Sequence, residues 1–205
     1  MNSKPIPVIV LHGGDIYPTH EDFLEHLRTK EVDLSRMKPK NDWKFNLGRE
    51  LGDGYDVLCP KMPTSDDARY EEWRLWFERV LNEINEPVIL VGHSLGAMFL
   101  TKYFTENTPK NTVISMHLIA SEYEDPSVSG HPATSFTLNK EPKNLTQKAN
   151  RVVFFHSKDD PVVSFENFDA FKNVLPDATF REFSDRGHFL DDTFPELVAE
   201  IQARN

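Results

Sequence analysis

Short runs of consecutive apolar residues recur along the chain, separated by longer segments in which apolar residues return every three or four positions. Such runs, rich in valine, isoleucine and phenylalanine, predict buried strands. Six strands are expected, at residues 6–11, 55–59, 87–91, 112–120, 151–156 and 178–183. The longer segments predict helices at residues 68–83, 95–106, 164–174 and 194–203. Strands that alternate with helices predict an α/β protein: a three-layer α/β/α sandwich with a doubly wound, mainly parallel sheet.

Two segments show helical spacing with particular clarity. In the segment 68–83, the apolar residues that share one face are Trp73, Trp76, Phe77, Val80 and Leu81. A stripe of this width predicts core packing. Near the N-terminus, Thr19 and Asp22 have the spacing of a capping box and predict a helix that carries Phe23, Leu24 and Leu27. The rest of the connection 12–54 is expected to be a long loop with further helices.

The composition is that of a folded protein. The chain has 205 residues, of which 39% are hydrophobic and 27% charged, enough apolar material for a sizeable core. We expect one domain over residues 1–205, with loop insertions at about 15–41 and 121–147. The single cysteine, Cys59, excludes an internal disulfide, and its place at a strand end predicts a small buried side chain.

Charge and apolar run length limit the partners and the location. The net charge of −10 argues against nucleic acid or an anionic membrane as the main partner, because binding phosphate requires concentrated lysine and arginine. No apolar run approaches the ~20 residues of a transmembrane helix. The first apolar run is short and leads into His12-Gly13-Gly14 rather than into a cleavage site. We therefore expect a cytoplasmic location.

The segment with the clearest chemistry lies between the predicted strand 87–91 and the predicted helix 95–106. It reads Gly92-His93-Ser94-Leu95-Gly96, which has the form G-x-S-x-G. A serine on a tight strand-to-helix turn projects its hydroxyl free of its own backbone, and the flanking glycines let strand and helix approach closely. The helix N-terminus supplies N–H groups and positive potential beside the hydroxyl. The pattern predicts that Ser94 is a nucleophile.

An activated serine needs a base and an orienting acid, and both follow Ser94 in the expected order. His188 follows the strand 178–183, and Asp159 and Asp160 follow the strand 151–156. The carboxyl ends of parallel strands share one edge of a sheet, so these side chains should lie near Ser94. Among the other carboxylates and histidines, the alternatives for the acid are Glu122, Glu124 and Asp125, and the alternative for the base is His156, which is better explained as a packed strand residue.

A fourth component follows the first strand. The loop Gly13-Gly14 should face the same edge, and its N–H, together with that of Leu95, would complete an oxyanion hole. His12, His93 and Met62 lie close to this centre in the sequence pattern and are candidates for contact with substrate, although both histidines are better interpreted as loop-positioning residues.

These segments together resemble the α/β-hydrolases, in particular the small, compact group that includes retinoblastoma-binding protein 9 and its bacterial relatives. The resemblance is carried by His12-Gly13-Gly14, Cys59-Pro60-Lys61-Met62-Pro63 with Trp73 after it, Gly92-His93-Ser94-Leu95-Gly96, Asp159-Asp160-Pro161 and Gly187-His188-Phe189. It implies the compact α/β-hydrolase fold, with Asp160, the aspartate before proline, as the acid and His188 as the base. The stretch from Asp15 to Asn41 is longer than the corresponding loop of that group.

The two long loops are the candidates for setting substrate preference, because loops at this edge usually carry specificity. The second loop offers few apolar residues to line an acyl pocket, namely Phe136 and Leu138, which argues against a large lipid substrate. The remaining histidines show no metal-ligand spacing, so no metal site is expected. Phosphate-binding glycine motifs are also missing from the sequence, and no cofactor is predicted.

The predicted function is that of a serine hydrolase, carboxylesterase-like, which cleaves small esters or related acyl compounds through an acyl-enzyme. Its partner is a small-molecule acyl substrate, and the sequence does not indicate a protein partner. Two alternatives remain. One is an amidase or peptidase that uses the same triad, and the other is a hydrolase-like scaffold that binds a protein.

Overall fold

The strands form one parallel sheet. The computed structural model describes residues 4–38, 41–123 and 134–203, without the side chains of residues 35 and 36. The strands are β1 (Ile6–Leu11), β2 (Tyr55–Leu58), β3 (Val88–His93), β4 (Val113–Ile119), β5 (Val152–Ser157) and β6 (Thr179–Phe183). Their order is β2-β1-β3-β4-β5-β6, and each neighbouring pair is parallel. The six predicted strands are confirmed, with ends that differ by at most two residues.

Burial along the strands follows their place in the sheet. Every residue of β3 and β5 is buried, whereas the edge strands β2 and β6 have none that is fully buried. A central parallel strand is covered on both faces, which is why its sequence is continuously apolar rather than alternating.

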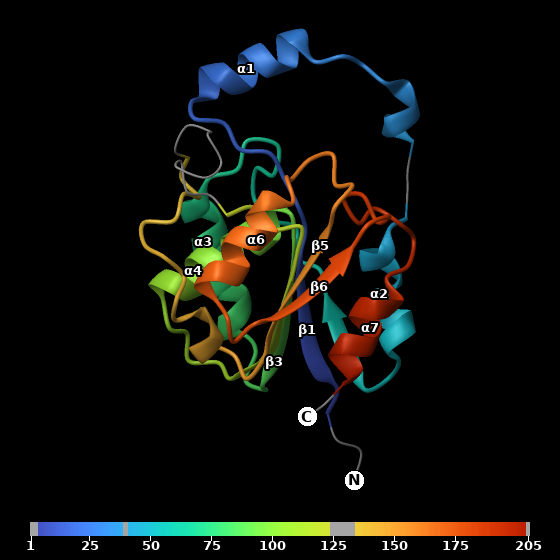
Figure 1. Cartoon of the computed structure of the whole chain (residues 1–205), viewed down its shortest axis with the longest axis vertical. Helices are drawn as coiled ribbons and strands as arrows, with labels where there is room; N and C mark the ends of the chain where they lie inside the picture. The colour runs from blue at the N-terminus through green and yellow to red at the C-terminus, as the bar shows by residue number, and fades with distance from the viewer. Residues whose placement is uncertain (1–3, 39–40, 124–133, 204–205) are drawn as a thin grey trace.

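Helices cover both faces of the sheet, as predicted (Figure 1). Their bounds are α1 (His20–Thr29), α2 (Trp43–Leu51), α3 (Tyr70–Asn82), α4 (Leu95–Glu106), α6 (Glu166–Val174) and α7 (Pro195–Gln202), with short 3₁₀ turns η1 (Leu34–Met37) and η2 (Leu145–Gln147). The buried apolar side chains of α3, α4 and α6 belong to one core cluster, and those of α2 and α7 belong to a second. The three-layer α/β fold class is therefore confirmed.

The apolar stripe of α3 packs largely as predicted. Trp73, Phe77 and Leu81 are buried, while Trp76 keeps 37% of its surface exposed. Phe136 lies edge-on against Trp73, with ring centroids 5.6 Å apart, and is 1% exposed. It is thus a core residue, and the expectation that it lines an acyl pocket is wrong. Cys59 is exposed, which corrects the prediction of a buried thiol.

Helix α1 differs from the others in its surroundings. The capping box at its start is confirmed, because Thr19 accepts a hydrogen bond from the Asp22 N–H and Asp22 accepts one from the Thr19 N–H. None of its residues is buried. Figure 1 shows α1 standing clear of the body, beyond the carboxyl ends of the strands. Across the described ranges, the helices are all too short or too polar to cross a membrane.

Candidate active site

Ser94 occupies a sharp turn between β3 and α4. Its backbone has φ 54° and ψ −122°, a left-handed φ that a residue with a side chain rarely adopts. The turn needs small neighbours: a Cβ on Gly96 would lie 2.4 Å from the Leu11 carbonyl oxygen, and one on Gly92 would lie 2.7 Å from the Ala97 backbone. The two glycines of the motif therefore serve close backbone contact, as the sequence pattern predicted.

The loop after β1 faces this serine. A Cβ on Gly13 would lie 3.1 Å from Ser94 Cβ and 3.5 Å from Ser94 Oγ. The N–H groups of Ala97 and Met98 both donate to the Ser94 carbonyl. Helix α4 itself leaves the N–H groups of Leu95 and Gly96 without intrahelical partners, so its positive end lies beside the hydroxyl.

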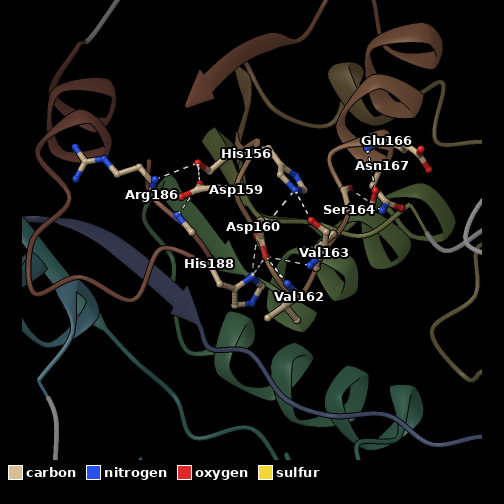
Figure 2. Close-up of polar contacts among 12 residues, drawn as sticks. His156, Asp159, Asp160, Val162, Val163, Ser164, Glu166, Asn167, Arg186 and His188 are labelled. Atoms are coloured by element: carbon tan, nitrogen blue, oxygen red, sulfur yellow. Dashed lines mark hydrogen bonds and ion pairs between the residues drawn. The ribbon is translucent and has the colours of Figure 1, made fainter. Parts of the chain in front are cut away.

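His188 and Asp160 are brought together from two different strand ends (Figure 2). The Nδ1 of His188 lies 2.9 Å from Asp160 Oδ2 and 3.0 Å from Oδ1, which makes Nδ1–H the donor to this carboxylate. The Asp160 side chain is fully buried, and its Oδ1 also accepts the N–H groups of Val162 at 2.8 Å and Val163 at 3.0 Å. With Nδ1 bound in this way, His188 Nε2 is left as an acceptor.

The same contacts set the charge of the acid. Burial raises the pKa of the Asp160 carboxyl, but the hydrogen bonds from His188 and from the N–H groups of Val163 and Val162 outweigh burial. Its pKa therefore lies below the ordinary value. Asp160 is ionised at neutral pH, and an ionised partner stabilises a protonated imidazole.

His93 links the serine turn to the loop that carries His188. Its Nε2–H donates to the His188 carbonyl at 2.8 Å, and the two rings lie 5.0 Å apart between centroids. Burial and the nearby charge of Lys44 hold the pKa of His93 well below its ordinary value, so it is neutral. In the described parts of the chain, no hydrogen bond joins Ser94 Oγ to His188 Nε2. Such catalytic contacts commonly tighten only when substrate binds.

Asp159 holds the same loop from the other side (Figure 2). Its Oδ1 accepts the Gly187 N–H at 2.9 Å and the Ser157 hydroxyl at 2.5 Å, while Ser157 Oγ accepts the Arg186 N–H at 3.1 Å. Gly187 has φ 48°, a conformation that favours glycine. Asp159 thus binds loop backbone and Asp160 binds the imidazole, which separates the two neighbouring carboxylates by role.

A contact that sequence reasoning missed comes from α2. Trp43 is buried, its indole N–H donates to the Phe189 carbonyl at 2.9 Å, and its backbone N–H donates to the Asp191 carbonyl at 2.9 Å. Nothing near Trp43 in the sequence signals this role, because its partners lie about 150 residues further along the chain.

The other candidates occupy supporting positions. His12 Nε2 accepts the Met62 N–H at 2.9 Å, so it joins the loop after β1 to the loop after β2. Met62 is 1% exposed and His93 3% exposed, so both side chains are buried. Their contact with substrate stays a prediction. His156 is buried and donates Nε2–H to the Val163 carbonyl at 2.9 Å, which agrees with its interpretation as a packed strand residue.

The sequence offered three other carboxylates as alternatives to Asp160 for the acid. Glu124 and Asp125 lie outside the described residues, and Glu122 follows β4 rather than β5.

Among the described side chains, no three histidine, cysteine or acidic groups gather in a way that could hold a metal ion. A serine on a strained turn, a helix N-terminus and an imidazole bound to a buried carboxylate can together activate a hydroxyl for attack on a carbonyl.

Comparisons with known proteins identify the family of the chain. A family model described as "Serine hydrolase" matches residues 36–197. Serine hydrolase RBBP9 of Rattus norvegicus is 27% identical over 157 residues, which cover 76% of this chain and 81% of that protein.

Two solved structures have the same fold. The ydeN gene product of B. subtilis has a TM-score of 0.72 at 20% identity, with 97% of this chain and 98% of that chain covered. The esterase domain of a Rhodothermus marinus protein has a TM-score of 0.61 at 18% identity, with 98% and 84% covered. At these identities the likeness establishes the α/β-hydrolase fold of the chain.

Proposed function

Because the chain belongs to the serine hydrolase family, we propose that it cleaves small carboxylic esters or related acyl compounds through a covalent acyl-enzyme intermediate. The observation that carries the proposal is the contact of His188 Nδ1 with both oxygens of the buried Asp160, at the sheet edge where Ser94 occupies its strained turn. A purely structural serine turn needs neither a buried carboxylate nor an imidazole oriented by it.

The first half of the proposed reaction forms the acyl-enzyme. Ser94 Oγ attacks the carbonyl carbon while His188 Nε2 takes its proton, and Asp160 stabilises the imidazolium. The N–H groups of Leu95 and of Gly13 or Gly14 bind the oxyanion that develops. Collapse of this intermediate breaks the bond to the leaving group, which receives the proton from His188.

The second half of the reaction restores the enzyme. His188 Nε2 takes a proton from water as the water attacks the acyl-enzyme carbonyl. The resulting oxyanion again lies at the N–H groups beside Ser94. Its collapse breaks the bond to Ser94 Oγ, which regains its proton from His188, and the carboxylic acid leaves.

A covalent probe tests the proposal. We expect wild-type protein to gain the mass of one fluorophosphonate adduct, and Ser94→Ala and His188→Ala to gain none within the same time. Ser184→Ala is the matched control, because Ser184 is an exposed serine of the loop that carries His188. Wild type and Ser184→Ala should hydrolyse p-nitrophenyl acetate, and Ser94→Ala and His188→Ala should not. A folded wild type without adduct or turnover would refute the proposal.

A further inference from the structure

The segment between the oxyanion loop and α2 connects the two sides of the candidate site. We call its described part, residues 18–38, the strap. Before it, the Asp15 N–H donates to the Ser65 carbonyl at 2.9 Å, and Arg69 donates to the Tyr17 carbonyl at 3.0 Å. After it, Trp43 is tied to the loop that carries His188. The strap therefore starts beside the oxyanion loop and ends beside the loop of the base.

The strap carries apolar side chains that the body does not cover. An amphipathic helix normally buries its apolar stripe, but α1 buries no residue. The large apolar residues of the strap that are between 54% and 72% exposed are Leu27, Val32, Leu34 and Met37. Figure 1 shows α1 and the turn that follows it beyond the carboxyl ends of the strands. Ser94 follows β3 directly, and Asp160 and His188 come after the ends of β5 and β6, so the candidate site lies at the same edge of the sheet.

The body also has exposed apolar residues, and two of them lie close in the chain to Asp160 and His188. Val162, 67% exposed, follows Asp160 by two residues, and its N–H is bound to that carboxylate. Leu190, 64% exposed, follows His188 by two residues. In the described ranges, six of the nine large apolar residues that are exposed lie on the strap or at these two positions. All six belong to segments at or beyond the carboxyl edge of the sheet, the edge that carries Ser94.

We propose that the strap, with Val162 and Leu190, binds the hydrocarbon chain of the acyl group while its carbonyl lies at Ser94. The inference rests on the proposed function and names its substrate class: esters of medium-chain, unbranched acyl groups. An acyl chain is the occupant that the proposed chemistry supplies, because a substrate of Ser94 places its carbonyl at the carboxyl edge of the sheet, the edge that the strap spans. Burial of each methylene between strap and body then adds to transition-state binding.

Esters of graded length test the inference. We expect wild-type kcat/KM to rise from p-nitrophenyl acetate to the octanoate. In the variant Leu27→Ser, Leu34→Ser and Met37→Ser, kcat/KM should fall about tenfold or more for the octanoate and stay near wild type for the acetate. The control is Phe45→Ser with Leu75→Ser, two exposed apolar residues outside the strap, and it should keep the wild-type dependence on chain length.

The outcomes separate this inference from the proposed function. Turnover of every ester with the same chain-length profile in wild type and strap variant would overturn the strap's role while leaving the hydrolase intact. Dissociation of a wild-type dimer by the strap substitutions, with that profile unchanged, would also overturn it, because the strap would then be an interface between copies. A wild type that fails to react with fluorophosphonate and with every ester would refute both proposals.

Discussion

Substitution of Asp160 by asparagine separates the chemical role of this carboxyl from its structural role. Both backbone N–H groups that bind it, from Val162 and Val163, donate to Oδ1, at 2.8 and 3.0 Å. An asparagine carbonyl accepts the same two hydrogen bonds. Its NH₂ group then takes the place of Oδ2, 2.9 Å from His188 Nδ1. We expect the loop to keep its conformation.

The direction of the hydrogen bond to His188 Nδ1, however, is reversed. The NH₂ group donates to His188 Nδ1, while the amide Oδ1, 3.0 Å from Nδ1, is already occupied by the N–H groups of Val162 and Val163. We therefore expect Nδ1 to accept and the ring proton to move to Nε2. A protonated Nε2 cannot take the proton of Ser94. In a serine protease triad the same substitution lowers kcat about 10⁴-fold, which corresponds to ~5 kcal/mol of transition-state stabilisation. We expect a fall in kcat of this order for p-nitrophenyl ester hydrolysis, with an unchanged Tm.

The neighbouring substitution Asp159→Asn is the matched control. The Oδ1 of Asp159 accepts two hydrogen bonds, from Ser157 and Gly187, and an amide oxygen can accept both. Initial rates and thermal unfolding would be measured for both variants, and Asp159→Asn should stay near wild type in both. A large loss of kcat in Asp159→Asn combined with near wild-type kcat in Asp160→Asn would refute the assignment of the acid.

Two further predictions concern stability. Burial, with the charge of Arg151, lowers the pKa of His117 to about 3. At a pH between the unfolded pKa of 6.5 and this folded pKa, the unfolded chain binds one more proton than the folded protein, so the free energy of unfolding falls as pH falls. Because His117→Gln removes this group, the unfolding free energy measured in urea should fall by about 2 kcal/mol less in the variant than in wild type between pH 7.5 and 5. An equal fall in wild type and variant would contradict the prediction. Because Ser94 has φ 54°, Ser94→Gly should be more stable than Ser94→Ala by about 1 kcal/mol; equal unfolding free energies would show that the turn is unstrained.

The parts of the fold that local pattern determines were predictable. Central strands such as β3 and β5 are covered on both faces, so their sequences are continuously apolar and their bounds could be placed within two residues. The turn at Ser94 was equally clear, because strand, glycines and helix follow one another in the chain. Here sequence order and spatial order coincide.

Features that depend on strand order or on distant partners were not predictable. Cys59 follows β2, an edge strand, and is exposed for that reason, but nothing in the sequence says which strand lies at the edge. In α1, the periodicity identifies an apolar stripe correctly, yet periodicity does not reveal whether a partner covers the stripe. The role of Trp43 was missed for the same reason, since its partner Phe189 lies 146 residues away in the chain.

The loop that carries His188 shows why the candidate site depends on tertiary structure more than its short motifs suggest. Several side chains from outside the loop bind its backbone. Three of them are His93 at the His188 carbonyl, Asp159 at the Gly187 N–H and Trp43 at the Phe189 carbonyl. They come from β3, from the turn after β5 and from α2, on both sides of the base. The motif identifies His188 as the candidate base, but these contacts fix where its ring lies, so the position of the imidazole depends on residues far outside its own motif.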